Sequence, residues 1–146
     1  MKKMKRIVHG RLERRVNRFI AEVFINGEKE QVHIKNTGRL KELLQPNAEV
    51  LLEQSDNPNR KTKFSLIAAA KNGSWVNIDS QAPNQVVFEA LKEGKIQAFD
   101  SLKSLKREVT YKDSRFDFYV EQHDKKGFIE VKGVTLAENG VALFPD

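Results

Sequence analysis

Two acidic residues and one lysine near the end of the chain have the types and spacing expected of a site that acts on phosphate. Asp117 lies in one short run of alternating apolar and polar residues, and Glu130 and Lys132 lie in the next. Alternation with period two predicts a strand for each run. If the strands form a hairpin around a four-residue loop, 122–125, with their apolar faces together, Asp117 lies opposite Glu130. The two runs are Ser114–Val120 and Gly127–Lys132.

The same alternation divides the side chains of the first run between two faces of the predicted sheet. Phe116, Phe118 and Val120 are expected on the apolar face. Asp117 and Tyr119 are expected on the opposite face, because successive side chains of a strand point to opposite sides.

Two carboxylates directly opposite each other in an antiparallel pair repel. A divalent cation between Asp117 and Glu130 removes this conflict, and Mg²⁺ or Mn²⁺ suits carboxylate ligands. Lys132, on the face of Glu130, could hold a phosphate or help to activate a water molecule. The pattern of Asp117 followed by Glu130-x-Lys132 resembles the PD-(D/E)xK nuclease site. The alternative is an ordinary solvated face, on which Asp117 pairs with Arg115.

Length and composition set limits on the class of protein. The 146 residues allow one ordinary domain or two small ones, and 39% apolar residues with 32% charged residues are within the globular range. A net charge of +6 favours a polyanionic partner. The absence of cysteine excludes disulfides and thiolate metal sites. No apolar run is long enough to span a membrane, and we expect a cytoplasmic protein with no membrane association.

The first 80 residues read as strands, a short helix and further strands, which is the order of an OB-like barrel. Asn26-Gly27 between two apolar-patterned runs is a strong hairpin signal. A helix of one or two turns is predicted over Arg39–Leu44. The predicted strands are Ile7–Leu12, Phe19–Ile25, Lys29–Ile34, Ala48–Gln54, Lys63–Ala70 and Ser74–Ile78.

Barrels of this kind bind single strands with a basic groove and aromatic platforms. Phe19, Phe64 and Trp75 are candidates for stacking, although aromatic residues in apolar strands are more often part of a core. The basic residues, for which a merely solvated surface is the alternative, are Arg11, Arg14, Arg15, Arg18, Arg39, Arg60 and Lys61.

The second domain is predicted over residues 84–146, after a linker at 80–84. Asn84 can cap a helix from Gln85 to Lys92, and three strands follow from Lys106 onward. Glu89 on this helix is either solvated or turned toward the carboxylate site. The fold class is α+β: an OB-like barrel followed by an incomplete nuclease-like αβββ domain. Because the chain stops at a Pro-Asp pair directly after an apolar run, we expect a truncated sequence.

Several segments, taken in order along the whole chain, resemble the sugar fermentation stimulation protein A family. One departure is Ile34-Lys35, where relatives often have a Cys-Pro pair; another is the length, because relatives continue past the final Pro-Asp. The segments are Arg15–Phe19, Asn36–Gly38, Ser55–Pro58 with Arg60-Lys61, Pro83-Asn84 with Glu89-Ala90, Ser114–Phe118, Glu130–Leu136 and Phe144–Asp146.

The resemblance implies an OB-like domain, a PD-(D/E)xK nuclease-like domain and DNA binding with little sequence preference. It also implies a link to regulation of sugar catabolism, notably of maltose. Asp117, Glu130 and Lys132 match the nuclease motif as catalytic residues. Asp117 and Glu130, with Glu89 from the first helix, match the ligands of a Mg²⁺ or Mn²⁺ ion.

Three functional hypotheses follow. The first is a DNA-binding protein whose second domain is a Mg²⁺- or Mn²⁺-dependent phosphodiesterase. The second is a regulator with the same fold that holds DNA without cleaving it. The third is an RNA-binding OB module with a structural appendage. The oligomeric state and the preferred DNA structure stay open.

Overall fold

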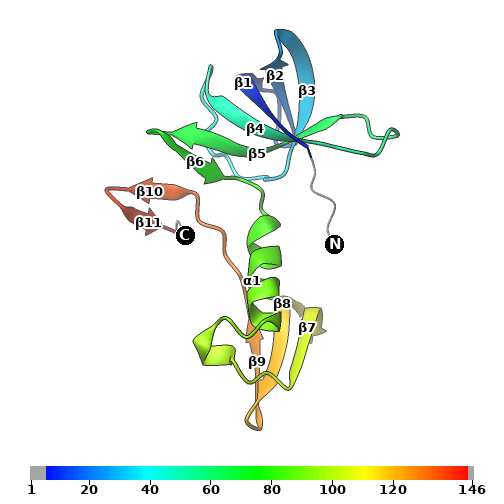
Figure 1. Cartoon of the computed structure of the whole chain (residues 1–146), viewed down its shortest axis with the longest axis vertical. Helices are drawn as coiled ribbons and strands as arrows, with labels where there is room; N and C mark the ends of the chain where they lie inside the picture. Colours follow the sequence, from blue (N-terminus) through cyan, green and yellow to red (C-terminus); the bar gives the residue numbers. More distant parts are fainter. Residues whose placement is uncertain (1–5, 145–146) are drawn as a thin grey trace. The chain divides into compact units, whose positions relative to one another are not determined.

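The computed structural model describes residues 6–144, which form two compact units (Figure 1). The first unit contains the described residues up to Ser80 together with those from Val134 onward, and the second contains Gln81–Gly133. The second unit is therefore shorter than the expected domain, 84–146. Pro145 and Asp146, which belong to the resemblance given above, lie outside the described residues.

The first unit is an OB-like barrel, as predicted. Its sheet has the order β3-β2-β1-β4-β5-β6, and a short parallel pairing of β3 with β5 closes the barrel. The strands are β1 (Ile7–Arg15), β2 (Ile20–Ile25), β3 (Glu28–Ile34), β4 (Glu49–Gln54), β5 (Phe64–Lys71) and β6 (Ser74–Asn77).

Period-two alternation fills the barrel interior with branched apolar side chains. Val23, Val32 and Leu66 are fully buried in the core, whereas their neighbours along each strand are mostly more exposed. The β2–β3 and β5–β6 hairpins turn at Asn26-Gly27 and Asn72-Gly73, where both residues of each pair have positive φ. Such turns match the twist of the flanking strands, so the Asn-Gly prediction is confirmed.

The segment between β3 and β4 makes a single turn rather than a longer helix. The Leu44 amide donates to the Leu40 carbonyl at 2.9 Å, and the turn places Leu43 in the core. The turn lies within the range of one or two turns predicted for Arg39–Leu44.

The second unit has one helix and an antiparallel sheet of order β7-β8-β9. The helix begins at Ala82, after Gln81 as its N-cap, with a proline in its first turn. The predicted cap, Asn84, is therefore wrong. The elements are α1 (Ala82–Lys92), the 3₁₀ turn η1 (Gln97–Phe99), β7 (Ser104–Tyr111), β8 (Ser114–Gln122) and β9 (Lys125–Ile129).

The β8–β9 hairpin has the predicted register but a shorter turn. Phe118 pairs with Ile129, and Gln122 pairs with Lys125, so the loop has two residues instead of the predicted four. Those two residues, at 123 and 124, both have positive φ, which is typical of a two-residue hairpin turn. Strand β9 ends at Ile129, one residue before Glu130.

The predicted face of Phe116 on β8 is wrong. The β7–β8 ladder keeps the same register on both sides of Glu108, which has a φ of +51°. Phe118 is fully buried and stacks on Phe88 of α1 at 6.1 Å. Phe116 instead stacks on Phe128 at 4.4 Å, and Phe128 is the cross-strand partner of Tyr119. Phe116 therefore joins the aromatic side chains on the face away from Phe118.

The last described strands, β10 (Leu136–Glu138) and β11 (Val141–Leu143), form a small hairpin that belongs to the first unit. Within residues 6–144, no helix has the length and apolar character needed to cross a membrane.

Candidate nucleic-acid interface and carboxylate site

The loop between β1 and β2 is built around Asn17. The Oδ1 atom of Asn17 accepts hydrogen bonds from the amides of Phe19 and Ile20 at 2.8 and 2.9 Å. A side chain that binds its own following backbone in this way fixes a tight turn. The turn leaves Arg18 exposed and Phe19 53% exposed.

Arg15 holds this loop against the segment that follows β3. Its guanidinium makes five hydrogen bonds, of 2.5 to 3.1 Å, all to backbone carbonyl oxygens. A guanidinium has five N–H donors, so none remains for a ligand. Partial burial, with the nearby charge of Arg18, lowers the pKa of Arg15 below its ordinary value. The five acceptors belong to Asn17, Arg18, Asn36, Gly38 and Arg39.

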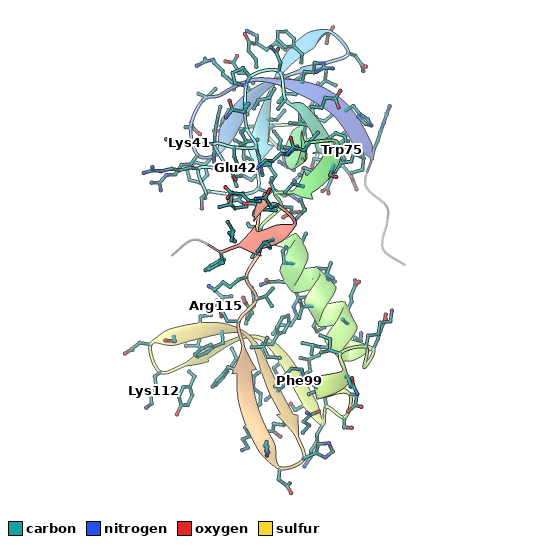
Figure 2. The ribbon with its side chains drawn as sticks, turned by 90° about the vertical axis from the view of Figure 1, so that its left-hand side faces the viewer. Lys41, Glu42, Trp75, Phe99, Lys112 and Arg115 are labelled. Carbon is teal, nitrogen blue, oxygen red and sulfur yellow. The ribbon has the colours of Figure 1, made fainter. Side chains whose placement is uncertain are left out.

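A cleft of about 770 Å³ lies at the junction that Arg15 organises. Besides Arg15, three basic residues line it: Arg18, Arg39 and Lys41. No carboxylate is among the described residues that line it. Figure 2 shows Lys41 on the segment that follows β3, next to the acidic Glu42. The cleft is therefore a positively charged surface in which at least three side chains can face a ligand.

Two other basic residues predicted to bind nucleic acid form ion pairs within the barrel. Arg14 forms an ion pair with Glu22, and Arg11 pairs with Glu49 at 3.1 Å. Such pairs reduce the net charge that these arginines present to a polyanion.

The two basic residues in the loop before β5, Arg60 and Lys61, differ in their contacts. Arg60 donates to Thr62 and Ser65, at 3.2 and 3.0 Å. Lys61 is exposed, and no partner is found for it among residues 6–144.

Of the three aromatic residues of the barrel that are candidates for base stacking, one packs against the core and two are exposed. Phe64 packs against the core, in line with the alternative considered for it. Trp75 is 44% exposed and meets His9 edge-on at 5.9 Å. Phe19 lies on the loop that lines the cleft, so it is the aromatic residue best placed beside the basic side chains.

In the second unit, Asp117 is held by both of its carboxylate oxygens. Its Oδ1 accepts from Asn84 Nδ2 at 2.9 Å, and its Oδ2 accepts from the Val131 amide at 2.7 Å. The Asn84 bond fixes Asp117 against the first turn of α1, and the Val131 bond fixes the segment that contains Glu130 beside it. The Asn84 side chain that resembles a helix cap in the sequence thus has a different partner.

Glu130 and Lys132 lie together just beyond the end of β9. Lys132 Nζ is 3.5 Å from Glu130 Oε1, and both side chains are about half exposed. Glu89, on α1, accepts a hydrogen bond from Gln85 at 2.9 Å. Among the described residues no three acidic or histidine side chains gather as a metal site, so Glu89, Asp117 and Glu130 are not assembled as one.

The donor chemistry at Asp117 and Glu130 nevertheless fits a hard cation. A carboxylate has about four lone-pair positions. The two hydrogen bonds of Asp117 occupy one position on each oxygen. Oxygen ligands of this kind are those that Mg²⁺, Mn²⁺ and Ca²⁺ prefer.

Two residues at these sites escaped the sequence interpretation. Lys41 lies in the segment predicted as a short helix, and the sequence interpretation does not include it among the nucleic-acid-binding residues. Its charge and its position two residues after Arg39 are the signals that could have identified it. Asn84 was assigned to a cap, and only the fold reveals its contact with Asp117, thirty-three residues away.

Comparison with known proteins covers both units. A profile described as SfsA N-terminal OB domain matches residues 14–78, and one described as Sugar fermentation stimulation protein RE domain matches residues 81–146. Proteins named Sugar fermentation stimulation protein homolog, from Alkaliphilus oremlandii and Clostridium beijerinckii, are each 54% identical over 99% of the chain. The chain spans 63% of the length of each.

The fold also matches a solved structure, that of Pyrococcus furiosus SfsA in complex with Ca²⁺. The TM-score is 0.86 with 28% sequence identity, and the match covers 100% of this chain and 63% of that one. Both halves of the chain thus resemble the same kind of protein in sequence and in structure. The chain belongs to the sugar fermentation stimulation protein (SfsA) family.

Proposed function

We propose that the chain binds DNA through the cleft of its barrel, with little preference for base sequence. The observation that carries this proposal is the set of three basic side chains, Arg18, Arg39 and Lys41, that line a cleft without a carboxylate. In OB folds the loop between the first two strands and the loop between the fourth and fifth are common sites of oligonucleotide binding.

The character of the cleft favours contacts with the nucleic-acid backbone. Lysine and arginine contacts with phosphates supply affinity but read no sequence directly. Phe19 adds a stacking surface that accepts any base, since every base has a π-face.

Removal of two cleft charges tests this proposal. In the double variant Arg18→Ala/Arg39→Ala, we expect at least a tenfold loss of affinity for a fluorescein-labelled 20-nucleotide DNA, or about 1.4 kcal/mol, measured by fluorescence anisotropy. Arg14→Ala is the matched control, because Arg14 belongs to the same basic run but pairs with Glu22. Equal losses in both variants would contradict the cleft as the site. Tenfold tighter binding of RNA of the same sequence would overturn the choice of DNA.

A second candidate function is a Mg²⁺- or Mn²⁺-dependent phosphodiesterase site around Asp117. It is supported by the way Asn84 and Val131 hold the Asp117 carboxylate beside the Glu130 segment. The structural relative from Pyrococcus furiosus was solved in complex with Ca²⁺, a cation of the same hard class. The name of the relatives suggests that the DNA binding of this chain serves sugar fermentation.

In this proposal Asp117 and Glu130 would hold the cation, and Lys132 would act on the phosphate. A divalent cation supplies a Lewis acid that polarises phosphate oxygen and lowers the pKa of water. The Lys132 ammonium would stabilise negative charge as it develops on the phosphate. Asn84 would act as a positioning residue, since its side chain donates a hydrogen bond to Asp117.

Cation binding can be measured without any turnover. We expect Ca²⁺ and Mn²⁺ to raise the Tm of the wild-type chain, and the rise to disappear in Asp117→Asn. Asp113→Asn is the control, because Asp113 is an exposed carboxylate in the turn between β7 and β8 of the same unit. A Tm rise that persists in Asp117→Asn would remove Asp117 from the proposed site.

Nicking of supercoiled DNA then separates the enzyme from the regulator. Mn²⁺-dependent nicking that is lost in Asp117→Asn would support the phosphodiesterase. DNA binding without nicking would leave a non-catalytic regulator of sugar fermentation.

A further inference from the structure

We infer that two basic loops of the barrel, the β1–β2 loop with Arg18 and the loop before β5 with Arg60 and Lys61, form one continuous track for a single nucleic-acid strand. His33 lies at the centre of this track and is a contact that becomes charged when the strand binds. The inference rests on the proposed function, because it concerns how the same barrel holds nucleic acid. It adds three features to that function: the path of the nucleic acid across the barrel, a preference for a single strand, and the uptake of a proton by His33 on binding.

The β1–β2 loop, the first of the two, is joined to the end of β3 by a backbone hydrogen bond. The Ile34 amide donates to the Phe19 carbonyl at 2.8 Å, and His33 pairs with Ile20 in the β2–β3 ladder. The loop that carries Arg18 and Phe19 therefore enters β2 directly beside His33.

The second loop reaches His33 from the other side. His33 pairs with Ser65 in the parallel β3–β5 contact. The Ser65 hydroxyl accepts a hydrogen bond from Arg60 at 3.0 Å, and Lys61 follows Arg60 in the same loop. Arg60 is thus held against β5 next to His33, and Lys61 is the following residue of the loop.

The side chain of His33 faces outward between these loops. Its neighbours along β3, Val32 and Ile34, are both buried in the core. Because side chains alternate along a strand, His33 points away from the core. Its partial exposure agrees with this direction. Basic side chains on both loops and a histidine between them describe a path across β2, β3 and β5.

The surroundings of His33 disfavour its charged form in the free protein. Partial burial lowers its pKa, and the charges of Arg60 and Lys35 lower it further. Lys35 is itself close to two carboxylates, those of Glu53 at 3.4 Å and Asp79 at 3.7 Å. Arg60 is therefore the nearby cation that a bound phosphate would most effectively neutralise.

A phosphate on this track reverses the electrostatic effect on His33. An anion nearby favours the charged imidazolium and raises the pKa of His33. Since the bound state then holds more protons than the free state, affinity must increase as the pH falls through the interval between the two pKa values. A neutral surface histidine away from the strand would not produce this linkage.

The track also favours a single strand over a duplex. Phe19, an exposed aromatic residue, follows Arg18 directly in the first loop. Bases must be unpaired to stack on such a ring, so a duplex could use only the charges of the track.

The test compares three histidines of one protein. Binding of a fluorescein-labelled oligo(dT) 15-mer is measured by anisotropy at pH 5.5, 6.5, 7.5 and 8.5, at constant ionic strength. We expect the affinity of the wild type to increase several-fold from pH 8.5 to 5.5. His33→Gln should abolish most of this increase. His9→Gln and His123→Gln, as matched controls, should keep it.

A second measurement reports the proton directly. The His33 ring is titrated by NMR in the free protein and in the complex, and its pKa should rise on binding. An unchanged His33 pKa, or an equal pH effect in His33→Gln, would overturn the inference while DNA binding itself stands. Tighter binding of a 15-base-pair duplex than of the single strand would overturn the assignment to a single strand. Absence of any binding at low salt would instead refute the proposed function, and the inference with it.

Discussion

Arg15 differs from the arginines around it because its guanidinium is fully engaged with backbone carbonyl groups of the protein. Those carbonyls come from both the β1–β2 loop and the segment after β3. Arg15 therefore contributes the position of the basic cleft, whereas Arg18 and Arg39 contribute its charge toward a ligand. Arg15 and Arg18, only three residues apart, are therefore expected to differ in effect: Arg15 acts on stability and Arg18 on binding.

Arg15→Lys should lower the free energy of unfolding by about 1–3 kcal/mol, because the lysine ammonium has three donors and cannot replace the five hydrogen bonds of the guanidinium. The measurement is urea unfolding followed by circular dichroism. Arg14→Lys is the control, and a change below about 1 kcal/mol is expected for its exposed ion pair. Equal stability of Arg15→Lys and the wild type would show that the five bonds do not organise the loops.

At the level of single elements, the strands of the barrel and the hairpin register follow closely from alternation and turn residues. The pairing of Phe118 with Ile129 was predictable because both runs have strict period-two patterns. The position of Phe116 was not, because its stacking on Phe128 departs from the alternation of the strand. The start of α1 was misplaced because Asn84 has two possible uses, as a cap or as a partner of Asp117.

Strand β1 offers a sharp test of barrel packing at Gly10. A Cβ atom there would lie 2.6 Å from Val23 Cγ1 and 3.0 Å from the Phe24 carbonyl oxygen. Gly10→Ala should therefore destabilise the barrel by about 1–3 kcal/mol through overpacking, as measured by urea unfolding. Gly127→Ala in β9 is the control, because no atom lies within 4 Å of the added methyl group. A neutral Gly10→Ala would contradict the close approach of β1 and β2.

For the whole molecule, the order of strands and turns in the first 80 residues predicts an OB-like barrel, and the barrel is confirmed. The cleft itself was only partly predictable. It depends on Arg15 joining residues that are more than twenty positions apart, and such non-local hydrogen bonds have no local pattern. The carboxylate site was predicted from Asp117 and Glu130-x-Lys132, and its metal and its activity stay predictions.

The salt dependence of DNA binding tests the central claim, a cleft that contacts phosphates, most directly. Affinity of the wild type for oligo(dT) is measured by anisotropy between 50 and 300 mM NaCl. The account predicts a linear fall of log K with log salt, with a slope near −2 if about three phosphates are neutralised. It also predicts a clearly shallower slope for Arg18→Ala/Arg39→Ala. A salt-independent affinity, or the same slope in both proteins, would contradict it.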